Sequence, residues 1–145
     1  MVDASWFLGR DTIPDKREAQ QFEGSHIKVV SSQSIEGWSR VRGGWNNGDA
    51  YTVYYSLLSD VPFIVESCNE RLCLVAFSSE KVNVKIGVSL LSCEKARANI
   101  VDCSFDKQLS TLKAEWQRML SRLRYQGTER NMRMFYTALY HTMLM

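Results

Sequence analysis

The hydrophobic period of the chain changes at Ser92, and this change constrains the fold more than any other feature. Before Ser92, apolar residues recur at every second position in the clearest segment. After it, they recur every three or four positions. A period of two is typical of strands with one buried face, and a period of 3.6 is typical of helices. We therefore expect a mainly β fold with C-terminal helices.

The clearest alternation runs from Val82 to Leu90 and predicts an antiparallel strand. Its apolar residues are expected to face the core, and the polar residues between them are expected to face water. Gly87 falls on the polar face, where it indicates a bulge or a close approach of another backbone. The inward set is Val82, Val84, Ile86, Val88 and Leu90, and the outward set includes Asn83, Lys85 and Ser89.

Other strand signals in this part are separated by turn chemistry. The strongest turn signal is GGWNNGD at Gly43–Asp49. A short extended piece after Pro62 is expected at a sheet edge, because proline cannot donate to a strand ladder. The expected strands are a weak one at Ser25–Val30, a strong one at Ala50–Leu58, the edge piece at Phe63–Val65, and a returning hairpin strand at Arg71–Ser78 after a polar turn.

Three helices are expected after the change of period. Ser92 is placed to cap a short helix, and an amphipathic helix follows over Phe105–Leu123, in a segment that Gly127 ends. Thr128 is placed to cap the last helix, roughly Glu129–Met145.

The last helix is apolar on almost every side, so the sequence predicts that it is buried on every side. One stripe is Met132, Phe135, Leu139 and Met143, and a second is Met134, Ala138 and Met145. A dimer interface is one interpretation. We favour the other, in which the chain ends inside a larger domain whose further helices are absent. An uncovered stripe is then expected to promote self-association.

Composition excludes several classes of protein. Eighteen Lys and Arg against sixteen Asp and Glu give a formal charge of +2, too weak and dispersed to indicate a nucleic-acid partner. No apolar run reaches the ~18 residues of a membrane span, and the N-terminal sequence lacks the apolar region of a signal peptide. Four cysteines are too few for a disulfide scaffold, although Cys68 and Cys73 flank a predicted turn and a disulfide between them is an option.

Isolated motifs do not define a chemistry. His141 lies on the apolar last helix, where a hydrogen-bonded core residue is the commoner outcome, and His26 is the other histidine. No zinc, nucleophile-elbow or phosphate-loop motif is present. Glu66 and Glu70 border a turn and are expected to be solvated. Trp38 and Trp45 bracket a predicted loop, WSRVRGGW, where stacking on a sugar competes with the commoner role of burial at a sandwich edge.

Three ordered segments resemble the α-mannosidases of glycoside hydrolase family 92. They are IEGWSRVRGGWNNGDAYTVYYSLLSDVPF at Ile35–Phe63, VNVKIGVSLLSCEKARANI at Val82–Ile100, and FYTALYHTMLM at Phe135–Met145. The last is the most specific, and the first 34 residues match only loosely.

The resemblance implies a partial antiparallel β-sandwich over residues 1–103, a helical linker over 104–127, and the first helix of an incomplete (α/α)6 toroid over 128–145. Members of this family are calcium-dependent exo-α-mannosidases that invert the anomeric centre of mannose-containing glycans. Their acid, base and calcium ligands lie in the toroid, beyond the segments matched here. The resemblance therefore assigns no catalytic, cofactor-binding or metal-binding residue in this chain, which is itself predicted to be inactive.

Two further expectations follow. Enzymes of this family are commonly periplasmic or extracellular, although this chain shows no signal peptide. The alternative function is a non-catalytic β-sandwich module that binds carbohydrate or a protein partner, with Trp38 and Trp45 as the contacts to test.

Overall fold

The computed structural model describes residues 1–7, 10, 19–44 and 48–144. The chain divides into two compact units, Met1–Val101 and Asp102–Met145. The first is called the β unit and the second the helical unit.

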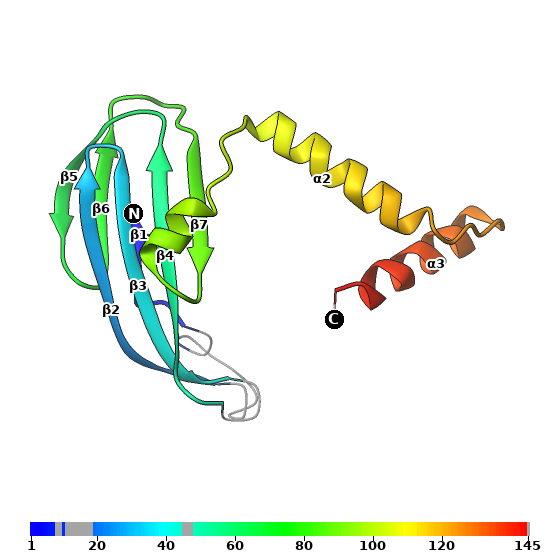
Figure 1. The fold of residues 1–145 in the computed structure, drawn as a ribbon, viewed down its shortest axis with the longest axis horizontal. Coiled ribbons are helices and arrows are strands. Elements are labelled where there is room, and N and C mark those ends of the chain that lie inside the picture. The colour runs from blue at the N-terminus through cyan, green and yellow to red at the C-terminus, as the bar shows by residue number, and fades with distance from the viewer. Residues whose placement is uncertain (8–9, 11–18, 45–47, 145) are drawn as a thin grey trace. The chain divides into compact units, whose positions relative to one another are not determined.

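The β unit contains two antiparallel sheets (Figure 1). In the described residues one sheet has the order β2-β3-β4-β7 and the other the order β1-β6-β5. The predicted partial antiparallel sandwich is confirmed, and so is the edge position of β5. The bounds are β1 Val2–Asp3, β2 Gln20–Ser31, β3 Ser34–Gly43, β4 Tyr51–Ser59, β5 Phe63–Cys68, β6 Leu72–Phe77 and β7 Val84–Ser89.

The core of the β unit lies between the β1-β6-β5 sheet and strands β2 to β4. Ile35 on β3 and Cys73 on β6 are fully buried, and the rings of Phe63 and Phe77 meet edge to face at 5.9 Å. The buried cluster is Ala4, Ile27, Ile35, Phe63 and Cys73, and the half-buried residues packed on it are Val2, Val29, Tyr55, Leu57, Val75 and Phe77. None of these residues comes from β7.

The expected burial of the apolar face of β7 is therefore wrong. Val84, Ile86 and Val88 are 44%, 62% and 58% exposed, because the described strands of the second sheet cover β2 to β4 and stop short of β7. The opposite face is covered instead by α1, Cys93–Ala98. A Cβ atom on Gly87 would collide with the carbonyl oxygen of Ala96, so the predicted close backbone approach is confirmed.

The helical unit consists of α2, Phe105–Leu120, and α3, Glu129–Thr142. The predicted caps are confirmed, since the side chains of Ser92 and Thr128 accept hydrogen bonds from the backbone N–H groups of Lys95 and Asn131. The amphipathic helix ends at Leu120, earlier than expected.

The early end of α2 has a local cause. The last helical hydrogen bonds come from the N–H groups of Ser121 and Arg122. After them the hydroxyl of Tyr136 holds the backbone: it donates to the carbonyl of Leu123 at 3.4 Å and accepts from the N–H of Tyr125 at 3.5 Å. A side chain of α3 thus sets where the turn between the helices runs.

Neither α2 nor α3 has a buried residue, so the described residues do not bury the last helix on every side, in line with the expectation that one stripe is uncovered. The stripe of Met132, Phe135, Leu139 and Met143 is half-buried, whereas Met134 on the second stripe is 61% exposed. Met145 lies outside the described residues. Among those residues, no helix is both long and apolar enough to cross a membrane.

Candidate functional site

A row of three ring side chains crosses the outer face of the β2-β3-β4-β7 sheet, the face opposite the core. His26 on β2 is the register partner of Trp38 on β3, and Trp38 is the register partner of Tyr54 on β4. Residues directly opposite each other in antiparallel strands project to the same face. His26, Trp38 and Tyr54 therefore form one continuous group, called the aromatic row.

Trp38 is the centre of the aromatic row. It is half-buried, and its six-membered ring packs over Gly24, where a Cβ atom would lie 3.7 Å from ring carbons. The predicted loop from Trp38 to Trp45 is wrong for residues 38–43, because β3 continues to Gly43 with β2 on one side and β4 on the other. Trp45 lies outside the described residues.

Charged groups continue along the same face of β3 beyond Trp38. Glu23 accepts from Arg42 Nε at 2.6 Å and from Arg40 Nε at 2.9 Å, and Arg40 Nη1 donates to Thr52 Oγ1 at 3.1 Å. The hydrogen bond from Arg42 is the main cause that holds the pKa of the Glu23 carboxyl below its ordinary value. An aromatic surface beside fixed donors and an ionised acceptor is suited to a polyhydroxylated ligand.

A second carboxylate borders the aromatic row on the side of α1. Glu36 Oε1 accepts from Arg97 Nε at 2.6 Å and from Ser56 Oγ at 3.3 Å, and Glu36 is buried. The bond from Arg97 is the main cause that lowers the pKa of Glu36, and burial opposes it. Glu36 is therefore an ionised anchor for α1, and a group held ionised cannot act as a general acid.

The remaining candidates from the sequence are separate from this row. Glu66 and Glu70 are exposed, as expected. His141 near the end of α3 is also exposed, so the prediction of a core histidine is wrong. Its ring meets that of Tyr140 edge to face at 5.8 Å, and no described residue covers it.

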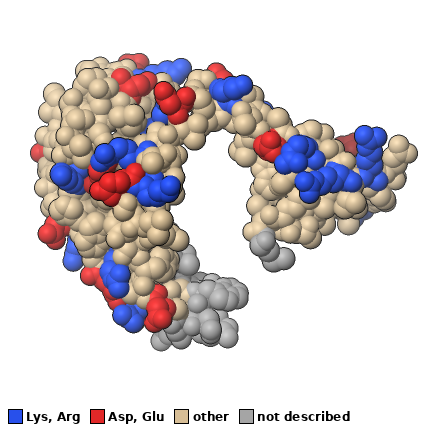
Figure 2. Space-filling view, in the orientation of Figure 1, with Lys and Arg blue, Asp and Glu red and all other residues tan. Residues whose placement is uncertain are grey.

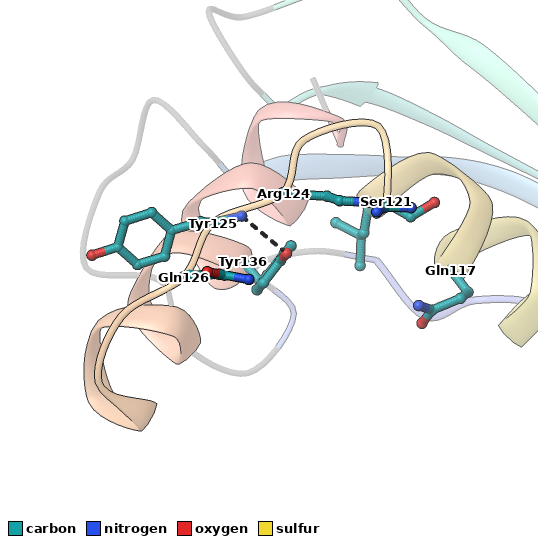
Figure 3. Close-up of a pocket in the computed structure, with 7 residues that line it drawn as sticks. Gln117, Ser121, Arg124, Tyr125, Gln126 and Tyr136 are labelled. Carbon is teal, nitrogen blue, oxygen red and sulfur yellow. Dashed lines mark hydrogen bonds between the residues drawn. The ribbon is translucent and has the colours of Figure 1, made fainter.

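The helical unit contains a hollow of about 530 Å³ where α2 meets the turn before α3 (Figure 3). Figure 3 shows the hydroxyl of Tyr136 directed at the backbone N–H of Tyr125, while the ring of Tyr125 points away from Gln117. The lining residues are Gln117, Leu120, Ser121, Arg124, Tyr125, Gln126 and Tyr136. This lining holds no carboxylate, so the hollow lacks the acid and base that glycoside hydrolysis requires.

Two aromatic contacts lie beside this hollow, one between α2 and α3 and one between the turn and α3. The rings of Trp116 and Tyr140 are 4.6 Å apart, and those of Tyr125 and Phe135 are 4.9 Å apart. Phe135 lies on the first apolar stripe predicted from the sequence, but the spacing of residues along a helix does not reveal which ring outside that helix each residue will meet.

A calcium site does not fit the residues at hand. Calcium takes six to eight oxygen ligands, several of them carboxylates. In the described ranges, no group of three or more His, Cys, Asp or Glu residues is placed to hold a metal ion. No step of a reaction is therefore assigned to calcium on this chain.

The charge distribution differs between the units (Figure 2). Both signs are interspersed over the visible face of the β unit, whereas Lys and Arg predominate on the visible face of the helical unit. The sequence 102–145 carries Lys107, Lys113, Arg118, Arg122, Arg124, Arg130 and Arg133 against Asp102, Asp106, Glu115 and Glu129. The aromatic row lies among paired charges rather than in a field of one sign.

Comparison with known families gives a match to the C-terminal part of the chain. Residues 92–145, which include α1, α2 and α3, match the family model described as the glycosyl hydrolase family 92 catalytic domain. No curated protein matches the chain.

Proposed function

Since residues 92–145 are a segment of a glycosyl hydrolase family 92 domain, we propose that the chain is part of an exo-acting α-mannosidase. Its substrates are α-mannosides such as N-glycans, and it acts with calcium and with inversion of the anomeric centre. The family match is the observation that carries this proposal. The resemblance of Ile35–Phe63 to the same family supports it for the β unit.

The proposed mechanism needs one carboxylic acid to protonate the leaving oxygen and one carboxylate to activate water, at a separation of roughly 6.5–9.5 Å. Glu23 is paired with Arg42 on β3 and Glu36 with Arg97 on α1, and the lining of the hollow in the helical unit has no acid. We assign the acid, the base and the calcium ligands to protein outside this chain. The described residues then provide support for a catalytic domain.

The burial pattern supports this assignment. Met134 on α3 and the apolar face of β7 are exposed, as are large apolar residues of α2 such as Leu112. These surfaces are suited to contacts with further protein. On this proposal, residues 104–127 are the linker and residues 128–145 the first helix of the (α/α)6 toroid.

The experiment is hydrolysis by the intact protein encoded by the full reading frame. We expect release of mannose from α-mannosides but not β-mannosides, β-mannose as the first product by NMR, and loss of activity with a calcium chelator. The 145-residue chain alone should release none, with or without calcium. Release of α-mannose first, or activity of the 145-residue chain, would contradict the proposal.

The aromatic row supports a second candidate, a carbohydrate-binding surface without catalysis. His26, Trp38 and Tyr54 present rings on one sheet face beside the Arg40–Glu23 pair. Calorimetric titration with mannose oligosaccharides tests it. Saturable binding that Trp38→Ala abolishes and Trp116→Ala leaves intact supports this function, and the absence of saturable heat at millimolar sugar contradicts it.

A further inference from the structure

Cys68 at the end of β5 and Cys73 at the start of β6 lie directly opposite each other in the β5-β6 hairpin. Both are free thiols. Cys73 is fully buried in the core of the β unit, whereas Cys68 is exposed. The hairpin therefore holds one accessible and one inaccessible sulfur in register.

A β-bulge produces this pairing. Phe63 pairs with Phe77 and Val65 with Val75, and an unbroken ladder would place Ser67 opposite Cys73. The register shifts between Val65 and Ser67, so that Ser67 pairs with Leu74 and Cys68 takes the position opposite Cys73. The bulge thereby turns Cys68 to the core-side face of the sheet, where Cys73 already lies.

The local hydrogen bonding favours a cross-strand bond. The N–H of Asn69 donates to the carbonyl of Leu72 at 2.9 Å, which makes the next pair, Cys68 and Cys73, a non-hydrogen-bonded pair. Such pairs have Cα atoms about 4.5 Å apart, within the span of a disulfide.

The turn is also held in place. The side-chain oxygen of Asn69 accepts from the N–H groups of Arg71 and Leu72, each at 2.8 Å. The two cysteine positions therefore lie at the base of a turn that is already folded, and little chain entropy is lost when they are joined.

We propose that Cys68 and Cys73 are a site of covalent modification, at which a small disulfide such as oxidised glutathione converts them to a disulfide across the hairpin. The thiolate of Cys68 attacks one sulfur of oxidised glutathione, forms a mixed disulfide and expels one glutathione thiolate. The thiolate of Cys73 then attacks the Cys68 sulfur and expels the second. Two thiol protons leave the protein, and its two electrons reduce oxidised glutathione to two glutathione molecules.

The exposure of the two sulfurs fixes the order of these steps. Cys68 is reached from solvent and reacts first, and the neighbouring Cys73 resolves the adduct. Burial raises the pKa of the Cys73 thiol above its ordinary value, so its thiolate is scarce near neutral pH. The second step should therefore be the slow one, and its rate should rise about tenfold for each pH unit between 7 and 9, since the thiolate is the nucleophile.

The test uses the full 145-residue chain with Cys93→Ser and Cys103→Ser, so that two thiols remain. After incubation with oxidised glutathione, we expect both thiols to disappear, the mass to fall by two hydrogens, and a peptide that links Cys68 to Cys73. The unmodified sequence is treated in parallel, and the same linked peptide is expected from it.

A matched control moves the exposed thiol from position 68 to position 67. It carries Ser67→Cys and Cys68→Ser together with Cys93→Ser and Cys103→Ser. Because position 67 pairs with Leu74, this variant should stop at the glutathione adduct. Three results would overturn the proposal. They are a lasting glutathione adduct on Cys68 with a free Cys73 thiol, a disulfide between two chains, or a disulfide within the control chain formed to the same extent.

Discussion

The β unit and the helical unit both contain regular, capped elements, yet among the described residues the buried core lies in the β unit. Ile35 and Cys73 are completely buried in the β unit, whereas neither α2 nor α3 contains a buried residue. Both units have capped helices and regular hydrogen bonds. This difference indicates that capping and hydrogen bonding determine where a helix or strand forms. Burial of apolar surface decides whether that helix or strand is stable by itself.

The energetics of α2 illustrate this. Its N-cap, Ser104, contributes about 1 kcal/mol, and the pair Arg118–Glu115 at 2.9 Å contributes about 0.4 kcal/mol. Isolated helices of this length are marginal in water. The seam with α3 adds the ring contact of Trp116 with Tyr140. The helical unit is therefore expected to need further apolar contacts in order to be stable, whereas the β unit is expected to be stable without them.

Matched truncations in the two units should show the largest difference. Ile35→Ala leaves a cavity in the core and should lower the free energy of unfolding of the β unit by about 3 kcal/mol. Leu112→Ala on α2, where the side chain is 56% exposed, should change the free energy of unfolding of the helical unit by less than about 0.5 kcal/mol. Urea unfolding followed by tryptophan fluorescence measures both. Equal losses would remove the distinction between the units.

Disruption of the contact between α1 and the sheet should have the next largest effect on the free energy of unfolding. Gly87→Ala places a methyl group against the carbonyl oxygen of Ala96 and should cost about 2 kcal/mol, because α1 must move. Gly24→Ala is the control, since its Cβ would meet Trp38 only at 3.7 Å, an ordinary contact distance. Thermal unfolding of both variants checks the prediction, which fails if Gly24→Ala is the more damaging change.

The ion pair between Glu36 and Arg97 should have a smaller effect. Because the pKa of Glu36 in the folded state is below its ordinary value of 4.5, its contribution to stability is complete above pH 4.5 and is lost as the pH falls through the folded value. Glu36→Gln should cost about 1 kcal/mol at pH 7, since the Arg97 side chain is 58% exposed.

Below pH 4 the gap in unfolding free energy between the Glu36→Gln variant and the unsubstituted chain should narrow. The same substitution at the exposed Glu80, which is outside this ion pair, is the control and should change the unfolding free energy at pH 7 by less than about 0.5 kcal/mol. A gap that stays constant from pH 7 to pH 3 would argue against the assigned role of the Glu36 carboxylate.

Removal of Thr128–Met145 should have the smallest effect on the β unit, less than about 0.5 kcal/mol, because α3 contributes nothing to its core. It should instead reduce self-association, since Met134 and Ala138 are exposed. Light scattering gives the particle mass, and circular dichroism gives the retained strand content. Met134→Lys should act in the same direction while keeping the helix. Loss of strand content on deletion would show that α3 is needed by the β unit.

The sequence predicts features that depend on a few neighbouring residues. Ser92 and Thr128 cap the helices that follow them, because an N-cap needs only one side chain and the first helical turn. The strand at β7 follows from its alternation. The alternation does not reveal which face of β7 is covered, because that depends on how far the second sheet extends and where α1 packs.

The candidate site is less predictable for the same reason. His26, Trp38 and Tyr54 come together only through the register of three strands, and the two glycines with positive φ, Gly43 and Gly44, lie at the end of β3 rather than beside Trp38. The opposition of Cys68 to Cys73 depends on a bulge that no residue type in β5 signals. Long-range register is the information that a single sequence carries least clearly.

Hydrogen exchange of the 145-residue chain tests the central distinction most directly. The strand β3, which carries Ile35, and its neighbour β4 are each paired on both sides. Their amides should exchange only with global unfolding of the β unit. Amides of α2 and α3 should exchange far faster at low protein concentration and should gain protection only as the concentration rises. Protection of α2 and α3 equal to that of β3, independent of concentration, would contradict the account.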